Sequence, residues 1–212
     1  MIDRTIPGIL SAVPAASTDT NSNRRRAVYP GSFNPPTTAH LDIAEAAREQ
    51  RGLDLVVFTV SRSALAKQTV QHPELLHRLR VLEAAVSDRP WIEVRSTELQ
   101  LLADIAHGFD VLIMGADKWK QINDPVWYDN DPKKRDAVLA RLPELAIAPR
   151  PPVSVPARHR LEVPEHHART SSTNARAGEI EMMLPAAQLF AIETGAWIEP
   201  GRYDRWRAGL VW

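Results

Sequence analysis

Short apolar runs alternate with amphipathic stretches along residues 27–148 of this 212-residue chain. The runs typical of buried strands are Ala27–Tyr29, Leu55–Val60, Trp91–Val94, Val111–Met114 and Leu145–Ala148. Apolar residues at helical spacing separate them, at His40–Gln50, at Leu75–Val86 and from Leu99 to Ile105, where Thr97 is the expected N-cap and Gly108 the expected terminator. This alternation predicts an α/β fold with a doubly wound, Rossmann-like parallel sheet. Ligands of such sheets bind beyond the carboxyl ends of the strands.

The 17 prolines are numerous beside 9 glycines, and many of them gather outside the alternating region. Together with the Ser, Thr and Asn around Pro7 and Pro14, they predict a disordered leader over residues 1–25. Pro149–Pro156 reads as an extended linker. We expect one domain over residues 26–195 and a short C-terminal helical tail over 196–212. The aromatic residues of the tail either pack on the domain or form a subunit contact of a homo-oligomer, and these residues are Trp197, Tyr203, Trp206 and Trp212.

Charge and cysteine content exclude several classes of function. The 26 Lys plus Arg balance 26 Asp plus Glu, which argues against a broadly basic surface for nucleic acid or an anionic membrane. The opening segment is too short and interrupted for a membrane span, and it lacks the basic start of a signal peptide. The absence of cysteine excludes disulfides, thiolate metal sites and a cysteine nucleophile, and suits a cytoplasmic protein.

The loop after the first predicted strand has the composition of a phosphate-binding segment. It reads YPGSFNPPTTAH over Tyr29–His40, with one glycine and no lysine, so it matches neither GxGxxG nor GxxxxGK. Prolines stiffen the loop, and Thr37, Thr38 and His40 lie where the next helix begins. Free amides and the helix dipole attract phosphate at such a terminus. The alternative is that His40 is simply the first polar residue of a surface helix.

A second segment of this kind lies near the end of the chain, as RTSSTNAR over Arg169–Arg176. The hydroxyls of Ser171, Ser172 and Thr173 can cap a following helix, and Arg176 lies one turn on, within reach of an oxyanion at the same terminus. Alone, this segment would be a capped surface helix. The two segments together favour a phosphate site.

These segments resemble the nucleotidyltransferases that carry (H/T)xGH and SSTxxR signatures, which include the nicotinamide and nicotinate mononucleotide adenylyltransferases and phosphopantetheine adenylyltransferase. The first signature is similar to Gly31–His40 and the second to Arg169–Arg176. Met114–Asp117 and Asp124–Trp127 look like the GAD segment and tryptophan of the mononucleotide adenylyltransferases. A weaker likeness covers Arg78–Leu82.

The resemblance implies transfer of an adenylyl group from ATP to a small phosphate-bearing acceptor, here nicotinate or nicotinamide mononucleotide, as in NAD biosynthesis. By this likeness His40 donates to an ATP phosphate in the transition state, and Thr37 replaces a first histidine. Asp117 accepts from the ribose, Trp127 stacks on the acceptor ring, and Lys67 and Arg78 bind the acceptor. The catalytic residues implied are Thr37, His40 and Arg176, and the ATP-binding residues implied are Gly31, Ser32, Phe33, His40, Gly115, Asp117, Ser171, Ser172, Thr173 and Arg176. No protein-bound metal is expected, since Mg²⁺ should arrive with ATP.

Two departures from the signatures leave alternatives open. Ala39 replaces the usual glycine before the final histidine, which favours a catalytically silent nucleotide-binding protein as an alternative. Thr37 and the YPGSF opening resemble the pantetheine branch, so phosphopantetheine adenylyltransferase is a further alternative, as is a cytidylyltransferase. Some of these residues also have purely structural interpretations. Asp117 could be a helix N-cap, Trp127 could be buried beside Trp119 and Tyr128, and Lys67 and Arg78 could be solvated on the surface.

Overall fold

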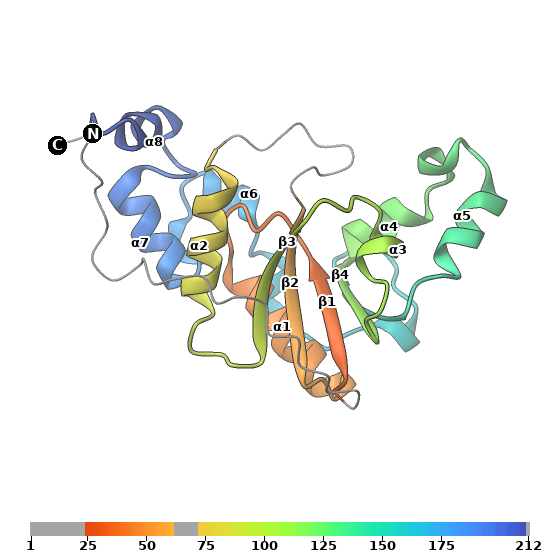
Figure 1. The fold of residues 1–212 in the computed structure, drawn as a ribbon. Helices are drawn as coiled ribbons and strands as arrows, with labels where there is room; N and C mark the ends of the chain where they lie inside the picture. The colour runs from red at the N-terminus through yellow and green to blue at the C-terminus, as the bar shows by residue number, and fades with distance from the viewer. Residues whose placement is uncertain (1–23, 62–71, 211–212) are drawn as a thin grey trace.

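A computed structural model describes residues 24–61 and 72–210 and contains a five-stranded, all-parallel sheet of order β3-β2-β1-β4-β5 (Figure 1). The strands are β1 (Arg26–Pro30), β2 (Leu55–Ser61), β3 (Ile92–Thr97), β4 (Val111–Gly115) and β5 (Glu144–Ala148). This order reverses direction between β1 and β4, which confirms the doubly wound α/β fold and creates a crevice at the carboxyl ends of these two strands. The predicted leader lies, apart from its last two residues, outside the described residues.

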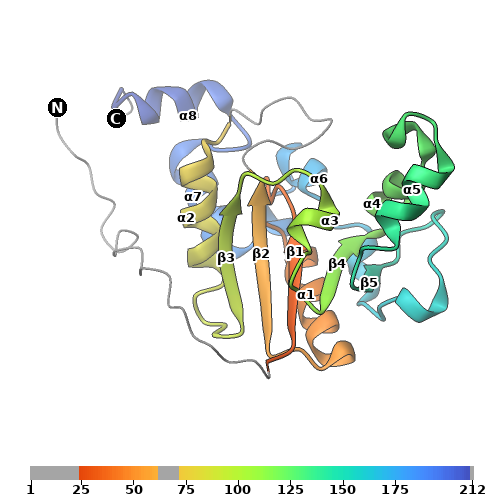
Figure 2. The same ribbon diagram turned by 45° about the vertical axis from the view of Figure 1, so that its right-hand side comes forward.

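Alternate residues of each strand build two cores, one on each face of the sheet. Ala27 and Tyr29 of β1 pack with Ile43 of α1 (Thr38–Arg51). Val28, which points the other way, packs with Ile105 of α3 (Leu102–Ile105). Figures 1 and 2 show α1 behind the strands and α3 in front of them. Continuous apolar strands such as β2 follow from this burial on both faces.

The remaining helices flank the sheet at its two ends. In Figure 1 the α4 to α5 segment lies beyond β4, whereas α7 and α8 lie beside α2. The α-helices are α2 (Leu75–Ala85), α4 (Ala116–Asn123), α5 (Pro132–Leu139), α6 (Ser172–Arg176), α7 (Pro185–Thr194) and α8 (Pro200–Arg207), and the 3₁₀ turns are η1 (Pro125–Tyr128), η2 (Ala157–His159), η3 (Glu165–Ala168) and η4 (Ile180–Met182). Within the described residues no helix is long and apolar enough to cross a lipid bilayer.

Two local predictions were wrong. Thr97 is not a helix N-cap but the last residue of β3, because its pairing with Ser61 of β2 keeps it extended, and α3 begins only at Leu102. The segment Pro149–Pro156 is not an extended linker. The Val153 N–H donates to the Arg150 carbonyl over 3.0 Å, which closes a turn, and Val155 is buried against the β4 and β5 face. Burial of these valines outweighs the tendency of the prolines to extend the chain.

The C-terminal residues pack on the domain through a third core between α2 and α7. Tyr203 of α8 is fully buried there, and Trp197 is almost so, whereas Trp212 lies outside the described residues. Val81 of α2 contributes from the other side. Of the two alternatives for the tail aromatics, the structure therefore realises packing on the domain for Trp197 and Tyr203.

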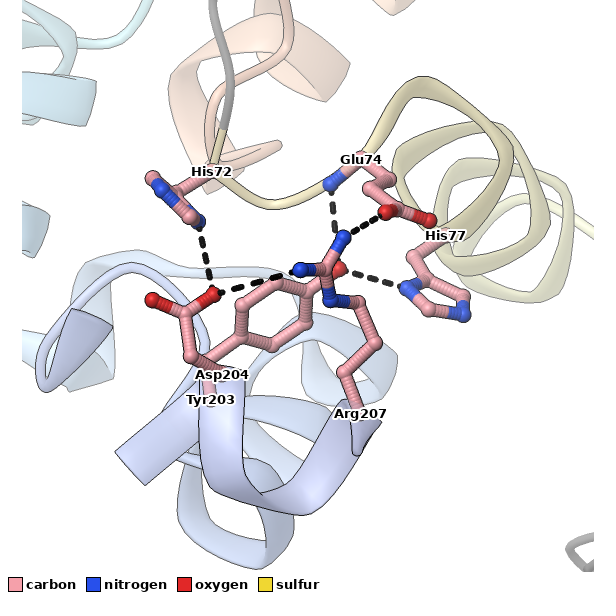
Figure 3. A network of polar contacts seen from close by, with 6 residues as sticks. All are labelled: His72, Glu74, His77, Tyr203, Asp204 and Arg207. Atoms are coloured by element: carbon pink, nitrogen blue, oxygen red, sulfur yellow. Dashed lines mark hydrogen bonds and ion pairs between the residues drawn. The ribbon is translucent and has the colours of Figure 1, made fainter. Parts of the chain in front are cut away.

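A polar network fastens α8 to the start of α2 (Figure 3). The Tyr203 hydroxyl accepts from the Glu74 N–H at 3.0 Å and contacts Nδ1 of His77 at 2.6 Å. Arg207 pairs with the Glu74 carboxylate, and Asp204 pairs with His72 at 3.4 Å. These contacts join α8 to the residues that precede and begin α2, and so hold the tail against the domain.

Candidate active site

A pocket of about 240 Å³ opens at the carboxyl ends of β1, β4 and β5. Seven of the predicted site residues line it, namely Thr37, His40, Gly115, Asp117, Ser171, Ser172 and Thr173. The N-termini of α1 and α6 therefore meet at one cavity, although their residues lie more than 130 positions apart in the chain. The other lining residues are Tyr29, Ala39, Ile43, Ala116, Ala148, Arg150, His167 and Thr170.

The imidazole of His40 is fixed by the residue that begins its own helix. The backbone N–H of Thr37 donates to Nδ1 of His40 over 3.0 Å, and the Thr37 hydroxyl lies 2.8 Å from the same nitrogen. Since Nδ1 accepts a hydrogen bond, the ring proton belongs on Nε2. Burial and, to a smaller extent, the nearby Arg150 lower the pKa of His40 from 6.5 to about 4, although a hydrogen bond with the Thr37 backbone acts in the opposite direction. The ring is thus a neutral donor near pH 7.

At α6, the three hydroxyls of the second signature have different tasks. Ser171 is the N-cap, and its Oγ accepts from the Asn174 N–H over 3.0 Å. The Ser172 hydroxyl donates to the Pro35 carbonyl over 2.8 Å and so ties α6 to the first loop. Thr173 accepts from Arg176 at 3.3 Å. The capping interpretation is therefore confirmed for Ser171, which lines the pocket as well.

Groups from distant segments hold the first loop through its carbonyl oxygens. Arg78 donates to the Ser32 carbonyl over 3.0 Å, Arg176 donates to the Asn34 carbonyl, and the Leu184 N–H donates to Pro36 over 3.1 Å. Trp197 adds a 2.7 Å bond from its indole N–H to the Asn34 side chain. The loop between β1 and α1 is therefore positioned by α2, α6 and the tail. The groups of this loop that face the pocket are held in place as a result.

Phe33 was predicted to bind ATP, but its side chain packs in the core, so that a contact between Phe33 and ATP stays a prediction for its backbone. The ring is 1% exposed and stacks on Phe58 with 4.9 Å between centroids, because it anchors the loop in the core. This anchoring requires a positive φ of 42° at Phe33, an unusual backbone conformation for a bulky residue. It also requires Gly31, since a Cβ there would lie 2.9 Å from the Phe33 ring. Gly31, Ser32 and Phe33 support the pocket but do not line it.

Arg78, a predicted acceptor contact, is 4% exposed and bonds the carbonyls of Ser32 and Pro73. The alternative that Arg78 is solvated on the surface is therefore wrong, because its side chain is buried and donates to two carbonyl oxygens. Arg176 does not line the pocket and bridges the two signatures instead. Whether either residue contacts a ligand stays a prediction.

Asp117 pairs with an arginine that the sequence reading missed. Its carboxylate lies 3.3 Å from Arg150, whose other terminal nitrogen donates to the Thr170 carbonyl at 3.3 Å. Asp117 is not the N-cap of α4, since Gly115 occupies that position and Asp117 follows Ala116 inside the helix. Arg150 comes two residues after β5. The position of Arg150 just beyond a strand could have identified it as a site residue. The surrounding prolines instead led to its assignment to the predicted linker.

Two more polar residues of the pocket were missed as site residues. Tyr29, the penultimate residue of β1, lines the pocket, and burial raises the pKa of its hydroxyl, so that it stays protonated. His167 lines the pocket and is 3% exposed, and burial lowers the pKa of its imidazole. Its neighbour His166 points elsewhere and lies 2.8 Å from the Asp42 carboxylate. The two adjacent histidines of this 3₁₀ turn thus point apart.

Two acceptor predictions remain, Trp127 and Lys67. Trp127 of η1 is 46% exposed and does not line the pocket, so the alternative that it is buried beside Trp119 and Tyr128 is wrong. Its stacking on a ring stays a prediction. Lys67 lies outside the described residues. Over residues 24–61 and 72–210, no group of three or more His, Asp or Glu side chains could hold a metal ion.

Comparison with known proteins gives one family for most of the chain. Residues 28–178 match the family model described as cytidylyltransferase-like. Three curated relatives are each named "Probable nicotinate-nucleotide adenylyltransferase". The protein of Lachnoclostridium phytofermentans is 36% identical over 75 residues, which cover 35% of this chain and 38% of the relative. That of Streptococcus pyogenes serotype M1 is 33% identical over 96 residues, covering 43% and 44%.

The third relative, from Citrifermentans bemidjiense, is 38% identical over 74 residues, which cover 35% of this chain and 34% of the relative. The matched segments thus span less than half of each relative's length. The relatives agree with the family model on the type of domain. The identity of the substrate has to be argued from the residues of the pocket.

Proposed function

This chain belongs to the cytidylyltransferase-like family of nucleotidyltransferases, and we propose that it transfers the adenylyl group of ATP to the phosphate of nicotinate or nicotinamide mononucleotide. The observation that carries the proposal is the convergence of Thr37–His40 and Ser171–Thr173 on one pocket. Two helix N-termini, hydroxyls and the Arg150 guanidinium form a donor-rich cavity suited to several phosphates. The names of the relatives support the acceptor.

The chemistry needs no covalent nucleophile from the protein. An oxygen of the acceptor phosphate attacks the α-phosphorus of ATP, the bond from that phosphorus to the bridging oxygen breaks, and pyrophosphate leaves with the bond electrons. Catalysis then depends on holding two anions in line and neutralising the charge that develops between them.

His40 supplies the donor for that charge. With Nδ1 occupied by the Thr37 N–H, its Nε2–H is the only ring proton, and it belongs to a residue that lines the pocket. A neutral donor of fixed orientation can strengthen its hydrogen bond to a phosphate oxygen as negative charge accumulates, without any proton transfer.

The leaving pyrophosphate would be held at α6 and by Arg150. The amides that follow Ser171 and the hydroxyls of this turn offer donors, and Arg150 offers a charge-assisted one after it releases Asp117. Asp117, once released, can accept from ribose hydroxyls. Mg²⁺ would arrive with the triphosphate and neutralise part of its charge, held mainly by phosphate oxygens, because among the described residues that line the pocket Asp117 alone carries a carboxylate.

Pyrophosphate release tests this proposal. ATP and CTP should each be offered with nicotinate mononucleotide, nicotinamide mononucleotide and phosphopantetheine, with the product identified by mass. We expect ATP with one of the two mononucleotides to give the fastest release. A preference for CTP as donor would indicate a cytidylyltransferase instead. A preference for phosphopantetheine as acceptor would indicate a phosphopantetheine adenylyltransferase.

A catalytically silent nucleotide-binding protein is the second candidate function, favoured by Ala39. Its methyl group lies on the wall of the pocket, and the residue is 5% exposed. Measurable ATP binding with no pyrophosphate from any acceptor in the same grid would select this candidate.

A further inference from the structure

The imidazole of His167 has a place in the pocket that neither signature explains. The residue is 3% exposed and lines the cavity. Among the described residues, no hydrogen bond of the structure involves its ring nitrogens, although its backbone carbonyl and N–H are bonded. Neither ring nitrogen is among the fully buried side-chain atoms of the described residues that lack a partner, so the ring is open to the cavity. A ring of this kind beside a cavity therefore points to a partner that enters the cavity.

The position of His167 is fixed by its neighbour. His166 lies 2.8 Å from the Asp42 carboxylate of α1, and this contact draws the turn η3 against that helix. The His166 side chain is 60% exposed, whereas His167 faces inward. His166 thus holds the turn to α1, and His167 is left facing the pocket.

One part of the pocket that His167 lines is apolar. Ala39 and Ile43 lie four residues apart on one face of α1, and Ala148 ends β5. All three line the pocket and are nearly fully buried. Phosphate donors lie at the N-terminus of α1, whereas this wall extends down the helix from it. A flat heterocycle fits an apolar wall with a single polar group.

Three charged or titratable groups surround His167, namely Arg150, Asp42 and His166, and Arg150 strengthens the effect of burial in lowering the pKa of His167. The ring is therefore neutral near pH 7, with one N–H donor and one acceptor nitrogen. That pattern suits the ring nitrogens and amino group of a base better than it suits a phosphate dianion, which only accepts.

We propose that His167 hydrogen-bonds the nucleobase of the donor nucleotide and is a specificity residue of this protein. The inference rests on the proposed function, in that the triphosphate of the same nucleotide occupies the helix N-termini. His167 acts on the base and not on the reacting phosphates. Its removal should therefore weaken binding of a nucleotide but not of a bare triphosphate.

The test measures dissociation constants of ATP, CTP and inorganic tripolyphosphate by calorimetry for the full chain. His167→Phe keeps a flat ring without hydrogen-bonding atoms, and His167→Ala only truncates, so it replaces the first variant if Phe prevents folding. We expect either variant to raise the Kd of the better-bound nucleotide about five- to tenfold, as loss of one buried hydrogen bond does, and that of tripolyphosphate less than about twofold. Glu165→Gln, an exposed residue of η3, is the matched control from the same turn, with both constants within about twofold of wild type.

Unchanged nucleotide affinity in the His167 variants would overturn the inference, and so would an equal loss for nucleotide and tripolyphosphate, which would indicate a structural role. These results are separable from failure of the proposed function. A wild-type protein that binds ATP but transfers nothing refutes the transferase and leaves the base contact standing. A His167 variant that binds and transfers like wild type refutes only the contact.

Discussion

The backbone N–H of Thr37 donates to Nδ1 of His40 over 3.0 Å, so the first residue of the helix cap also sets the tautomer of the pocket imidazole. This is a capping box with histidine in the place that glutamate or glutamine usually takes. Local helix chemistry and ligand chemistry thus share one side chain. The two tasks fall on different ring nitrogens, which makes them separable by mutation.

Two substitutions of His40 should separate these tasks. Asn places its amide near the position of Nδ1 and can keep the cap, whereas Gln reaches the position of Nε2 and can keep the donor. We expect His40→Asn to lower kcat by about two to three decades, as loss of one transition-state donor does, with little change in the KM for ATP. His40→Gln should retain more activity, and its thermal stability should be close to that of His40→Asn, because glutamine is itself a usual capping-box residue. Equal kcat for the two variants would contradict the assignment of Nε2 as the donor.

Acid should destabilise the fold through His40. Its pKa falls from 6.5 to about 4 on folding, so between these pH values the unfolded chain binds a proton that the folded chain does not. The free energy of unfolding should therefore fall as pH drops from about 6.5 towards 4, by up to about 1.4 kcal/mol per unit. Denaturant titrations of wild type and His40→Gln at several pH values test this. The other histidines contribute equally to both proteins, so the difference in the free energy of unfolding between them reports on His40. A difference between the two proteins that does not vary with pH would refute it.

Gly31 and Gly115 form a contrasting pair of glycines. A Cβ at position 31 would lie 2.9 Å from the Phe33 ring, whereas one at position 115 would meet nothing within 4 Å. We expect Gly31→Ala to cost about 1–3 kcal/mol of stability by overpacking. Gly115→Ala should cost less than about 1 kcal/mol but weaken ATP binding, because its methyl would enter the pocket. Thermal melts and calorimetry measure the two effects, and an equal loss of stability for both variants would be inconsistent with this contrast.

Arg150 should bind the triphosphate and tune His40 together. Removal of its charge by Arg150→Gln should raise the KM for ATP roughly tenfold. It should also raise the pKa of His40, since Arg150 is one cause of its lowering. NMR titration of the His40 ring and steady-state kinetics give the two readouts. Arg158→Gln, an exposed arginine of η2, is the control and should change neither value.

The sheet could be predicted because each of its strands contains a short apolar run that is visible in the local sequence. Burial on both faces demands a continuous apolar run, as in Leu55–Val60, and every described residue of that run is buried. Loops follow other rules. The burial of the Phe33 ring was not predicted because its contact with Phe58 joins residues 25 positions apart, and no local pattern reports such a pairing.

The same limit applies to the pocket. His40 and Ser171 were found because each lies in a local motif at a helix start. Arg150 and His167 were missed because their roles arise only when β5 and η3 are packed beside α1. Prolines near Arg150 also indicated a linker, whereas Val153 and Val155 fold that segment back on the sheet. Long-range contacts, and not local propensity, complete the site.

Ala39→Gly tests the departure of this chain from the usual signature. Its methyl group is part of the wall along which we expect the nucleoside to lie, between Ile43 and the helix N-terminus. Removing it should let the base approach α1 more closely and raise kcat/KM for ATP several-fold. The cost is up to about 1 kcal/mol of helix stability, because glycine is the more flexible residue.

Ala46→Gly carries the same helix cost without touching the pocket, since Ala46 belongs to α1 but not to the lining residues. The difference between the two variants in kcat/KM, at matched thermal stability loss, is therefore the effect of the methyl group on the ligand alone. A fall in kcat/KM for Ala39→Gly relative to Ala46→Gly would mean that the methyl packs favourably against the nucleotide. In that case the alanine is a feature of the binding wall and not an impairment, and the silent-protein alternative would lose its supporting observation.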